Sequence, residues 1–206
     1  MGFYVDRIVP RLTHFCCGSG RIAEQRALIV PEAEGTVVEI GFGTGHNLGY
    51  YRAGRVTQVI GIEPHAGMLG LADANLSASP VPVELHQGVA EELPLENRSA
   101  DTAVLTFTLC SVAEPLAALS ELRRVLKPTG RLLVLEHGRS DDQAVARWQD
   151  RLDPLWTRCA AGCHINRPMR LLIEEAGFSF AQLETFSLRG APKTVGFHSR
   201  GMAVPR

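Results

Sequence analysis

The sequence predicts an α/β fold in which helices cover both faces of a mostly parallel β-sheet. Apolar, strand-like segments alternate with segments of helical spacing over most of the 206 residues. The strand-like segments are almost continuously apolar, which is typical of strands buried on both faces of a parallel sheet. A glycine-rich turn follows the first of them, at residues 41–45. We expect one domain, because the length is ordinary for a single domain and no repeat or linker is present.

The expected elements follow one another in strand–helix order. The opening segment 3–15 has apolar residues at helical spacing, although Pro10 interrupts it. A second helix reaches about Val30 after a cap at Ser19 or Gly20. Apolar and β-branched residues predict strands at residues 36–40, 56–62, 83–86, 101–107 and 131–135. Helical spacing predicts helices at residues 45–52, 64–75 and 116–126.

The last third of the sequence continues with two helices and then two strands. The expected helices are residues 143–159 and 168–176. Residues 178–188 and 193–204 have the pattern of a closing pair of strands. Together with the five earlier strands, they predict a sheet of seven strands.

Composition and charge exclude several classes of protein. Hydrophobic residues make up 45% of the chain and charged residues 21%, as in soluble globular proteins. The net charge of −1 gives no electrostatic reason to expect a nucleic-acid partner. No apolar run approaches the roughly 18 residues of a spanning helix, and the first ten residues lack both a basic leader and an apolar signal core. We therefore expect a cytoplasmic protein with no transmembrane segment.

The five cysteines predict reduced thiols. They are odd in number and irregularly spaced, and no C-x-x-C pair of the kind that binds zinc is present. Cys159, Cys163 and His164 carry side chains that can bind a metal, but their spacing is not that of a metal motif. We expect no bound metal.

The turn at residues 41–45, Gly-Phe-Gly-Thr-Gly, predicts a ligand-binding corner. Glycine allows left-handed backbone angles and lets the main chain approach a ligand closely. A strand, such a turn and a helix start together direct backbone N–H groups at the ligand. The dinucleotide fingerprint is G-x-G-x-x-G, but here the third glycine comes one position early and His46 takes its place. A nicotinamide oxidoreductase and a tight turn without a ligand remain alternatives.

Suitable residues also follow the other predicted strands. Glu63 ends the second strand, at close to the roughly 20 residues beyond Gly41 that are expected of a ribose-binding acid. Residues 88–94 follow the third strand, 108–111 the fourth and 136–138 the fifth. In open α/β sheets the ligand binds at the carboxyl ends of the strands. The clustering therefore predicts a binding site at this edge.

Five segments from 3–138 resemble the class I S-adenosylmethionine-dependent methyltransferases, in the group that includes the quinone and sterol enzymes. They are EIGFGTGHN, VIGIEP, GVAEELPL, SADTAVLTFTLCSV and RVLKPTGRLLVLEHG. The resemblance implies one Rossmann-like domain over residues 1–206 that converts S-adenosylmethionine to S-adenosylhomocysteine. Its implied parts are a helical cap at 1–30, a cofactor-binding core at 35–138, and acceptor-side helices and closing strands at 139–206.

The same resemblance implies roles for individual residues. The first acid, Glu39, and the glycines hold the amino-acid half of the cofactor, and Glu63 accepts hydrogen bonds from the ribose hydroxyls. The family often has an aspartate where this chain has Val89, so the residues after it are expected to read the adenine. The expected cofactor-binding residues are Tyr4, Glu39, Gly41, Phe42, Gly43, Gly45, Asn47, Glu63, Pro64, His65, Ala90, Glu91 and Thr108.

A closer resemblance covers the carboxyl-terminal third. TLCSV, LEHG, WQDRLDPLW and GCHINR resemble the group of animal alkyl-thiol methyltransferases and their bacterial relatives. It implies methyl transfer to a small, largely apolar acceptor, with a thiol favoured. O-, N- or C-methylation of a phenol, quinone precursor or lipid headgroup is the alternative, and a cofactor-binding module without catalysis is the non-enzyme alternative. The animal enzymes carry a membrane-inserting amino-terminal helix that this sequence lacks, which weighs against a lipid-associated role.

His137 is the candidate general base, because it follows the fifth strand and imidazole titrates near working pH. The alternative is a histidine that orients a loop or donates to Glu136. Trp148 and Trp156 share one face of the helix at 143–159, a face that forms either core or a lid over an apolar acceptor. The expected substrate-binding residues are Cys110, Trp148, Trp156, His164 and Arg167.

Overall fold

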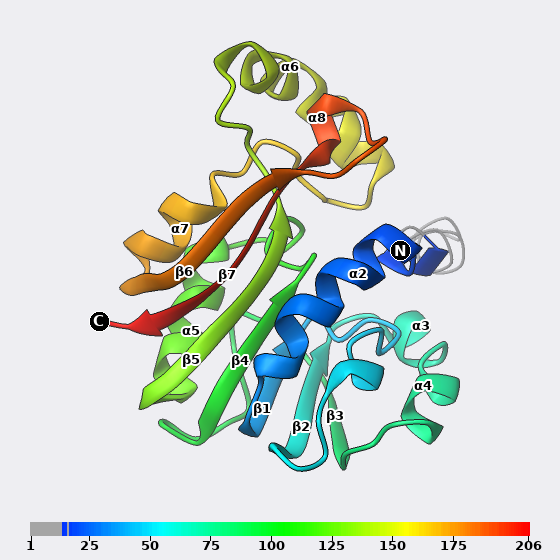
Figure 1. The fold of residues 1–206 in the computed structure, drawn as a ribbon, viewed down its shortest axis with the longest axis vertical. Coiled ribbons are helices and arrows are strands. Elements are labelled where there is room, and N and C mark those ends of the chain that lie inside the picture. Colours follow the sequence, from blue (N-terminus) through cyan, green and yellow to red (C-terminus); the bar gives the residue numbers. More distant parts are fainter. Residues whose placement is uncertain (1–13, 16) are drawn as a thin grey trace.

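The computed structural model describes residues 14–15 and 17–206, which form a seven-stranded sheet with helices on both faces (Figure 1). The strand order is β3-β2-β1-β4-β5-β7-β6. The expected opening helix at 3–15, including Tyr4, lies almost entirely outside the described residues.

The strands confirm the predicted sheet. They are β1 (Gly35–Ile40), β2 (Val56–Glu63), β3 (Val83–Gln87), β4 (Ala100–Thr106), β5 (Leu126–His137), β6 (Phe178–Ser187) and β7 (Phe197–Pro205). The first five are parallel, and β7 lies antiparallel to both β5 and β6. The carboxyl ends of β1 to β5 therefore meet at one edge, where the chain turns back after each strand.

Within residues 17–206, three helices have ten or more residues and the others are shorter. They are α2 (Gly20–Ile29), α3 (Ala66–Leu69), α4 (Asp73–Ser77), α5 (Pro115–Val125), α6 (Gln143–Cys159), α7 (Met169–Glu175) and α8 (Lys193–Gly196), with 3₁₀ turns η2 (Val30–Glu32) and η3 (Leu48–Tyr50). No helix among these described residues has both the length and the hydropathy of a membrane span. The expected cytoplasmic location stays a prediction.

Alternating side chains along the strands pack into two separate hydrophobic cores, one on each face of the sheet. Along β1, Val38 and Ile40 pack into one cluster with Leu122 of α5, whereas Val37 packs into the other with Ile29 of α2. Figure 1 shows the same division, because α2 crosses the front of the sheet while α5 lies behind it. The continuously apolar strands predicted from the sequence are thus buried on both faces.

The helix expected at residues 45–52 is wrong. The segment has only the 3₁₀ turn η3, and Tyr51 already has extended angles, with φ −68° and ψ 141°. Gly45 lies in the left-handed region at φ +75°, which an α-helix does not allow. A second glycine at Gly49 further lowers the helix propensity of so short a stretch.

Two other expected elements also differ from the structure. The helix predicted at 64–75 is two short helices, α3 and α4, and α3 ends at Gly70 as its C-cap. Gly67 and Gly70 each lower helix stability by about 1 kcal/mol relative to alanine. The strand predicted at 193–204 begins only at Phe197, because residues 193–196 form the helical turn α8 after Pro192.

A buried glutamine anchors α6, which projects beyond the end of the sheet (Figure 1). The Gln149 side chain is fully buried. Its Nε2 lies 2.8–3.0 Å from the carbonyl oxygens of Gly138, Ile165 and Thr194, and its Oε1 accepts from the Ser140 N–H at 2.9 Å. One side chain therefore ties α6 to the end of β5, to the loop before α7 and to α8.

Candidate active site

A cavity of about 390 Å³ opens where β1, β2 and β4 end. Its lining comes from the turn after β1, the end of β2, the loop 88–91 and the segment 106–113 after β4. Arg26 of α2 also contributes, as do Ala160 and Ala161 just after α6. The position is the edge at which open α/β sheets bind ligands, and the volume lies within the roughly 300–1,000 Å³ of small-molecule sites.

The turn after β1 has three glycines in left-handed conformations. The φ angles of Gly41, Gly43 and Gly45 are +65°, +59° and +75°. A Cβ added to Gly41 would lie 2.2 Å from Thr108 Oγ1, which is far inside van der Waals contact. The Thr108 hydroxyl in turn donates to the Ile40 carbonyl oxygen at 3.0 Å. Glycine is therefore required where the end of β1 meets the segment after β4.

The Glu63 carboxylate is oriented by main-chain donors. It is buried at the end of β2, and its oxygens accept from the Gly43 N–H at 2.9 Å and from the His65 N–H at 3.0 Å. Oε1 also lies 3.1 Å from His65 Nδ1, whereas Oε2 has one partner and retains an acceptor position for a ligand. Glu63 lines the cavity, so this oxygen can accept a hydroxyl donor of a ligand.

A buried arginine on α2 faces the same cavity. Arg26 Nη1 donates to Asn47 Oδ1 at 2.5 Å and to Thr106 Oγ1 at 2.8 Å. Its Nε is buried and has no hydrogen-bond partner in the part of the chain that the structure describes. Buried charges are rare unless they are paired, so an unused N–H at a cavity wall suits an anionic ligand group.

Sequence reasoning missed Arg26, although a signal was present. Ile22, Arg26 and Ile29 recur at helical spacing and form the buried side of α2. A charged residue among the apolar positions of an amphipathic helix is a candidate functional residue, because burying a charge is costly.

Glu39 belongs to the same polar network. Its two oxygens accept from Asn47 Nδ2 at 2.9 Å and from the Tyr51 hydroxyl at 2.6 Å. Complete burial raises the pKa of Glu39 to about 7, although the Tyr51 hydrogen bond and the Arg26 charge oppose the shift. The carboxyl group therefore titrates near neutral pH instead of remaining ionised throughout.

The end of the cavity beside β2 and β3 has the residues expected to contact adenine. Pro64, His65, Ala90 and Glu91 all line it. Val89, which stands where the family often has an aspartate, lines it as well. One Glu91 oxygen accepts from the main chain at 3.0 Å, which leaves the other for a ligand.

Most of the expected cofactor-binding residues lie at this cavity. Those that line it are Glu39, Gly41, Phe42, Gly43, Glu63, Pro64, His65, Ala90, Glu91 and Thr108. Asn47 and Gly45 lie just beyond the lining, where Asn47 bridges Glu39 and Arg26. Tyr4 is outside the described residues. Met68, which also lines the cavity, was missed because no motif includes it.

The residues expected to bind the acceptor do not line the cavity. Trp148 and Trp156 are on α6 and are 55% and 38% exposed, outside the cavity lining. The end of the cavity beside β4 is lined instead by the segment after β4 and by the residues just after α6. They are Phe107, Ser111, Val112, Ala160 and Ala161. The sequence placed Ser111 at this edge within residues 108–111, but the other four were missed because only the fold brings the two segments together.

His164 and Arg167 have structural contacts in the described chain. His164 Nδ1 lies 2.7 Å from Asp153 Oδ2. Arg167 donates to the carbonyl oxygens of Leu109 and Val112 at 2.5 and 2.7 Å, so it holds the segment after β4 in place. Substrate contacts by these residues and by the two tryptophans stay predictions.

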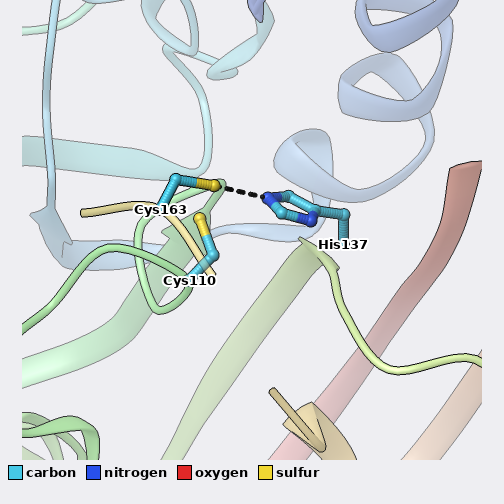
Figure 2. A group of neighbouring side chains, drawn as sticks. All are labelled: Cys110, His137 and Cys163. Carbon is cyan, nitrogen blue, oxygen red and sulfur yellow. Dashed lines mark hydrogen bonds between the residues drawn. The ribbon is translucent and has the colours of Figure 1, made fainter. Parts of the chain in front are cut away.

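His137, the expected base, lies with two cysteines behind the cavity wall (Figure 2). Its Nε2 is 3.2 Å from Cys163 Sγ, and its ring stacks on that of Phe107 at a centroid distance of 6.2 Å. The side chain of Cys110 completes the group. A hydrogen bond with Cys110, together with burial, raises the pKa of Cys163 above its usual value. Neither His137 nor Cys110 lines the cavity.

Comparisons with known proteins identify the family. The methyltransferase domain family matches residues 38–134. Thiol S-methyltransferase TMT1B of Rattus norvegicus is 34% identical over 83% of this chain and 71% of its own length. The chain belongs to the class I S-adenosylmethionine-dependent methyltransferases. This methyltransferase is also similar to the ubiquinone/menaquinone biosynthesis C-methyltransferase UbiE of Syntrophotalea carbinolica, at 34% identity over 68% of this chain and 62% of UbiE.

Solved structures share the fold of the methyltransferase. YcgJ of Bacillus subtilis matches with a TM-score of 0.70 at 17% identity, covering 89% of this chain and 98% of YcgJ. A methyltransferase of Thermotoga maritima, described as a possible histamine N-methyltransferase, matches with a TM-score of 0.68 at 24% identity, covering 98% and 97%. The cofactor is S-adenosylmethionine. The Arg26 side chain, which lines the cavity and whose Nε has no partner among the described residues, and the open acceptor position on Glu63 Oε2 fit its carboxylate and ribose.

Replacing Gly41 with alanine is expected to destabilise the methyltransferase by about 2–4 kcal/mol, from left-handed strain and overpacking against Thr108. Urea unfolding measures the loss. Gly49→Ala is the matched control, because nothing lies within 4 Å of its added Cβ, and it should change stability by no more than about 0.5 kcal/mol. Equal losses of stability in Gly41→Ala and Gly49→Ala would contradict the close approach of Thr108 to Gly41.

The raised pKa of Glu39 predicts a stability change between pH 4.5 and 7. The unfolded chain loses this proton near 4.5 and the folded chain near 7, so unfolding becomes easier as pH rises through that window, by about 3 kcal/mol. Urea unfolding without cofactor, in Glu39→Gln, should lack this component. Glu24→Gln, an exposed control on α2, should retain it. A pH slope identical in all three proteins would count against a neutral, buried Glu39.

Proposed function

We propose that this methyltransferase methylates a small, largely apolar thiol. The observation that carries the proposal is the likeness to TMT1B, a thiol S-methyltransferase, across most of the chain. The cavity supports it, because Phe107, Val112, Ala160 and Ala161 give its β4 end an apolar wall suited to an uncharged organic acceptor.

The cofactor is placed by groups at opposite sides of the turn after β1. Glu63 accepts from the ribose hydroxyls, and the loop 88–91 with Pro64 and His65 encloses the adenine. Arg26 pairs with the carboxylate, and Tyr4, which the resemblance also implies as a cofactor-binding residue, belongs to the same expected cap at 1–30. Because α2 is part of that cap, the cap still contributes to cofactor binding in this proposal.

When bound, S-adenosylmethionine supplies a methyl group on a sulfonium, and S-adenosylhomocysteine is the product. The protein's part is to align the acceptor with that methyl group and to exclude water, and alignment can lower a barrier by several kcal/mol. A thiol of pKa ~8.5 is partly ionised at neutral pH, so it needs less help from a base than a phenol or an alcohol does. His137 as that base stays a prediction.

C-methylation of a quinone precursor is the second candidate. It is favoured by the likeness to UbiE, which matches at the same identity but over less of this chain. A carbon acceptor must lose a proton from the ring, so this reaction depends on a base at the cavity more than thiol methylation does.

Glu63→Ala is expected to weaken S-adenosylhomocysteine binding by about 10- to 100-fold, because the ribose loses its charged acceptors. Isothermal titration calorimetry measures the change. Glu92→Ala, an exposed acid on the neighbouring loop, is the control and should bind like the unchanged protein. Undiminished affinity in Glu63→Ala would remove Glu63 from the cofactor site.

A panel of alkyl thiols, phenols, amines and demethylated quinones should show turnover with thiols first. Release of S-adenosylhomocysteine in the presence of each acceptor measures it, and mass spectrometry of the product identifies the methylated atom. Turnover confined to the quinones would establish the second candidate instead. Cofactor binding with no turnover on thiols would reject the thiol proposal.

A further inference from the structure

Cys110, His137 and Cys163 form a cluster of three metal-binding side chains that the methyltransferase fold does not itself explain. They come from the segment after β4, the end of β5 and the loop after α6. Figure 2 shows both sulfurs and the imidazole converging on one point. Their ligand atoms all lie within 4.8 Å of one another, and Cys163 Sγ is 3.2 Å from His137 Nε2.

These distances fit a tetrahedral zinc site after small rotations of the side chains. Zinc binds thiolate sulfur at about 2.3 Å and imidazole nitrogen at about 2.0–2.1 Å, which separates neighbouring ligand atoms by roughly 3.6–3.8 Å. The three groups already approach that spacing. Two cysteines and one histidine with an open fourth position are also a known ligand set of catalytic zinc.

Charge balance favours the same ion. Two thiolates neutralise Zn²⁺, so the zinc site carries no net charge into a partly buried region until an acceptor thiolate binds. Cys110 is 2% exposed, and both Cys163 and His137 are half-buried. A site of neutral ligands would leave two positive charges beside the apolar ring of Phe107.

The cluster lies directly behind the acceptor end of the cavity. Ser111 follows Cys110 and lines the cavity, and the Cys163 N–H donates to the carbonyl of cavity-lining Ala160 at 3.1 Å. Phe107 lines the cavity and stacks on His137. Cys110 is therefore next to a lining residue in sequence, His137 is one ring from the cavity, and Cys163 is linked to the wall by a main-chain hydrogen bond.

We infer that Cys110, His137 and Cys163 bind a zinc ion whose fourth position takes the sulfur of the acceptor thiol. The inference rests on the proposed thiol methylation. On binding, the acceptor S–H bond breaks, a zinc–sulfur bond forms and the proton leaves to solvent, because a coordinated thiol is deprotonated. The resulting thiolate is the nucleophile: its sulfur bonds to the methyl carbon while the bond from that carbon to the sulfonium sulfur breaks, the leaving sulfur keeps the electron pair, and there is no net oxidation or reduction. The product thioether is neutral and a weaker ligand, which favours its release. His137 acts here as a ligand and not as a base.

Cobalt(II) titration of the metal-free, fully reduced protein tests the site. One equivalent should bind with a thiolate-to-cobalt charge-transfer band and tetrahedral d–d bands. Cys110→Ser and Cys163→Ser should each weaken binding by at least about 100-fold. Cys159→Ser is the matched control, because Cys159 is exposed at the end of α6, just before Ala160, and lies outside the cluster, and it should bind like the unchanged protein. Failure of the reduced protein to bind cobalt or zinc stoichiometrically, or full binding in both serine variants, would overturn the inference.

X-ray absorption of the zinc-loaded, unchanged protein gives a second measurement that needs no variant. Without an acceptor, the zinc should have two sulfur ligands. The number should rise to three after addition of ethanethiol and stay at two after addition of p-cresol. A count that ethanethiol does not change would refute the role of the fourth position.

Turnover separates this inference from the proposed function. Loss of thiol methylation on chelation, restored by zinc while S-adenosylhomocysteine affinity stays unchanged, supports both. Equal thiol methylation with and without metal would overturn the zinc inference and leave thiol methylation standing. Stoichiometric zinc with cofactor binding but no thiol turnover would reject the proposed function, and with it the acceptor role of the metal.

Discussion

The close approach of Thr108 to Gly41 fixes the geometry on which the cavity depends. The Thr108 hydroxyl donates to the last residue of β1, while the main-chain N–H groups of Thr108 and Leu109 donate to Glu136 Oε1 at 2.7 and 2.9 Å. Glu136 belongs to β5, so one small cluster of contacts holds the ends of three strands. Only a residue without a side chain at Gly41 permits this convergence, and the cavity is built directly upon it.

The buried polar network around Arg26 is costly for folding and useful for binding. Arg26 and Glu39 lie within the protein without a direct ion pair, joined through Asn47. Burial lowers the pKa of Arg26 and raises that of Glu39, so both shifts favour the uncharged forms. A cofactor that brings a carboxylate and an ammonium group into this region restores charge partners that folding alone leaves incomplete. We expect binding to stabilise the fold for this reason.

The sequence predicted the strands and the cofactor half of the site, because both depend on local patterns. The glycines of the turn and Glu63 come directly from strand ends, so their positions followed once the strands were recognised. The prediction of a helix at 45–52 was wrong because apolar spacing was given more weight than the two glycines, Gly45 and Gly49. The cavity lining beside the end of β4 could not be predicted from local patterns, because it joins Phe107 to Ala161, which only the tertiary fold brings together. The cysteine cluster shows the same limit, since the sequence grouped Cys163 with nearby Cys159 and His164, and the fold groups it with Cys110 and His137.

Within this one domain, the residue that holds α6 in place, Gln149, is separate from the residues that line the cavity. The glutamine binds four main-chain groups and no part of the cavity lining. The residues after α6, Ala160 and Ala161, form part of the apolar wall that we propose faces the acceptor, but they contribute nothing to the turn after β1. Evolution can therefore exchange the tip of this segment, and with it the chemistry that the enzyme accepts, while the parts that hold the methyl donor remain untouched. A single scaffold is thereby open to many acceptors through changes in one short, replaceable stretch of chain.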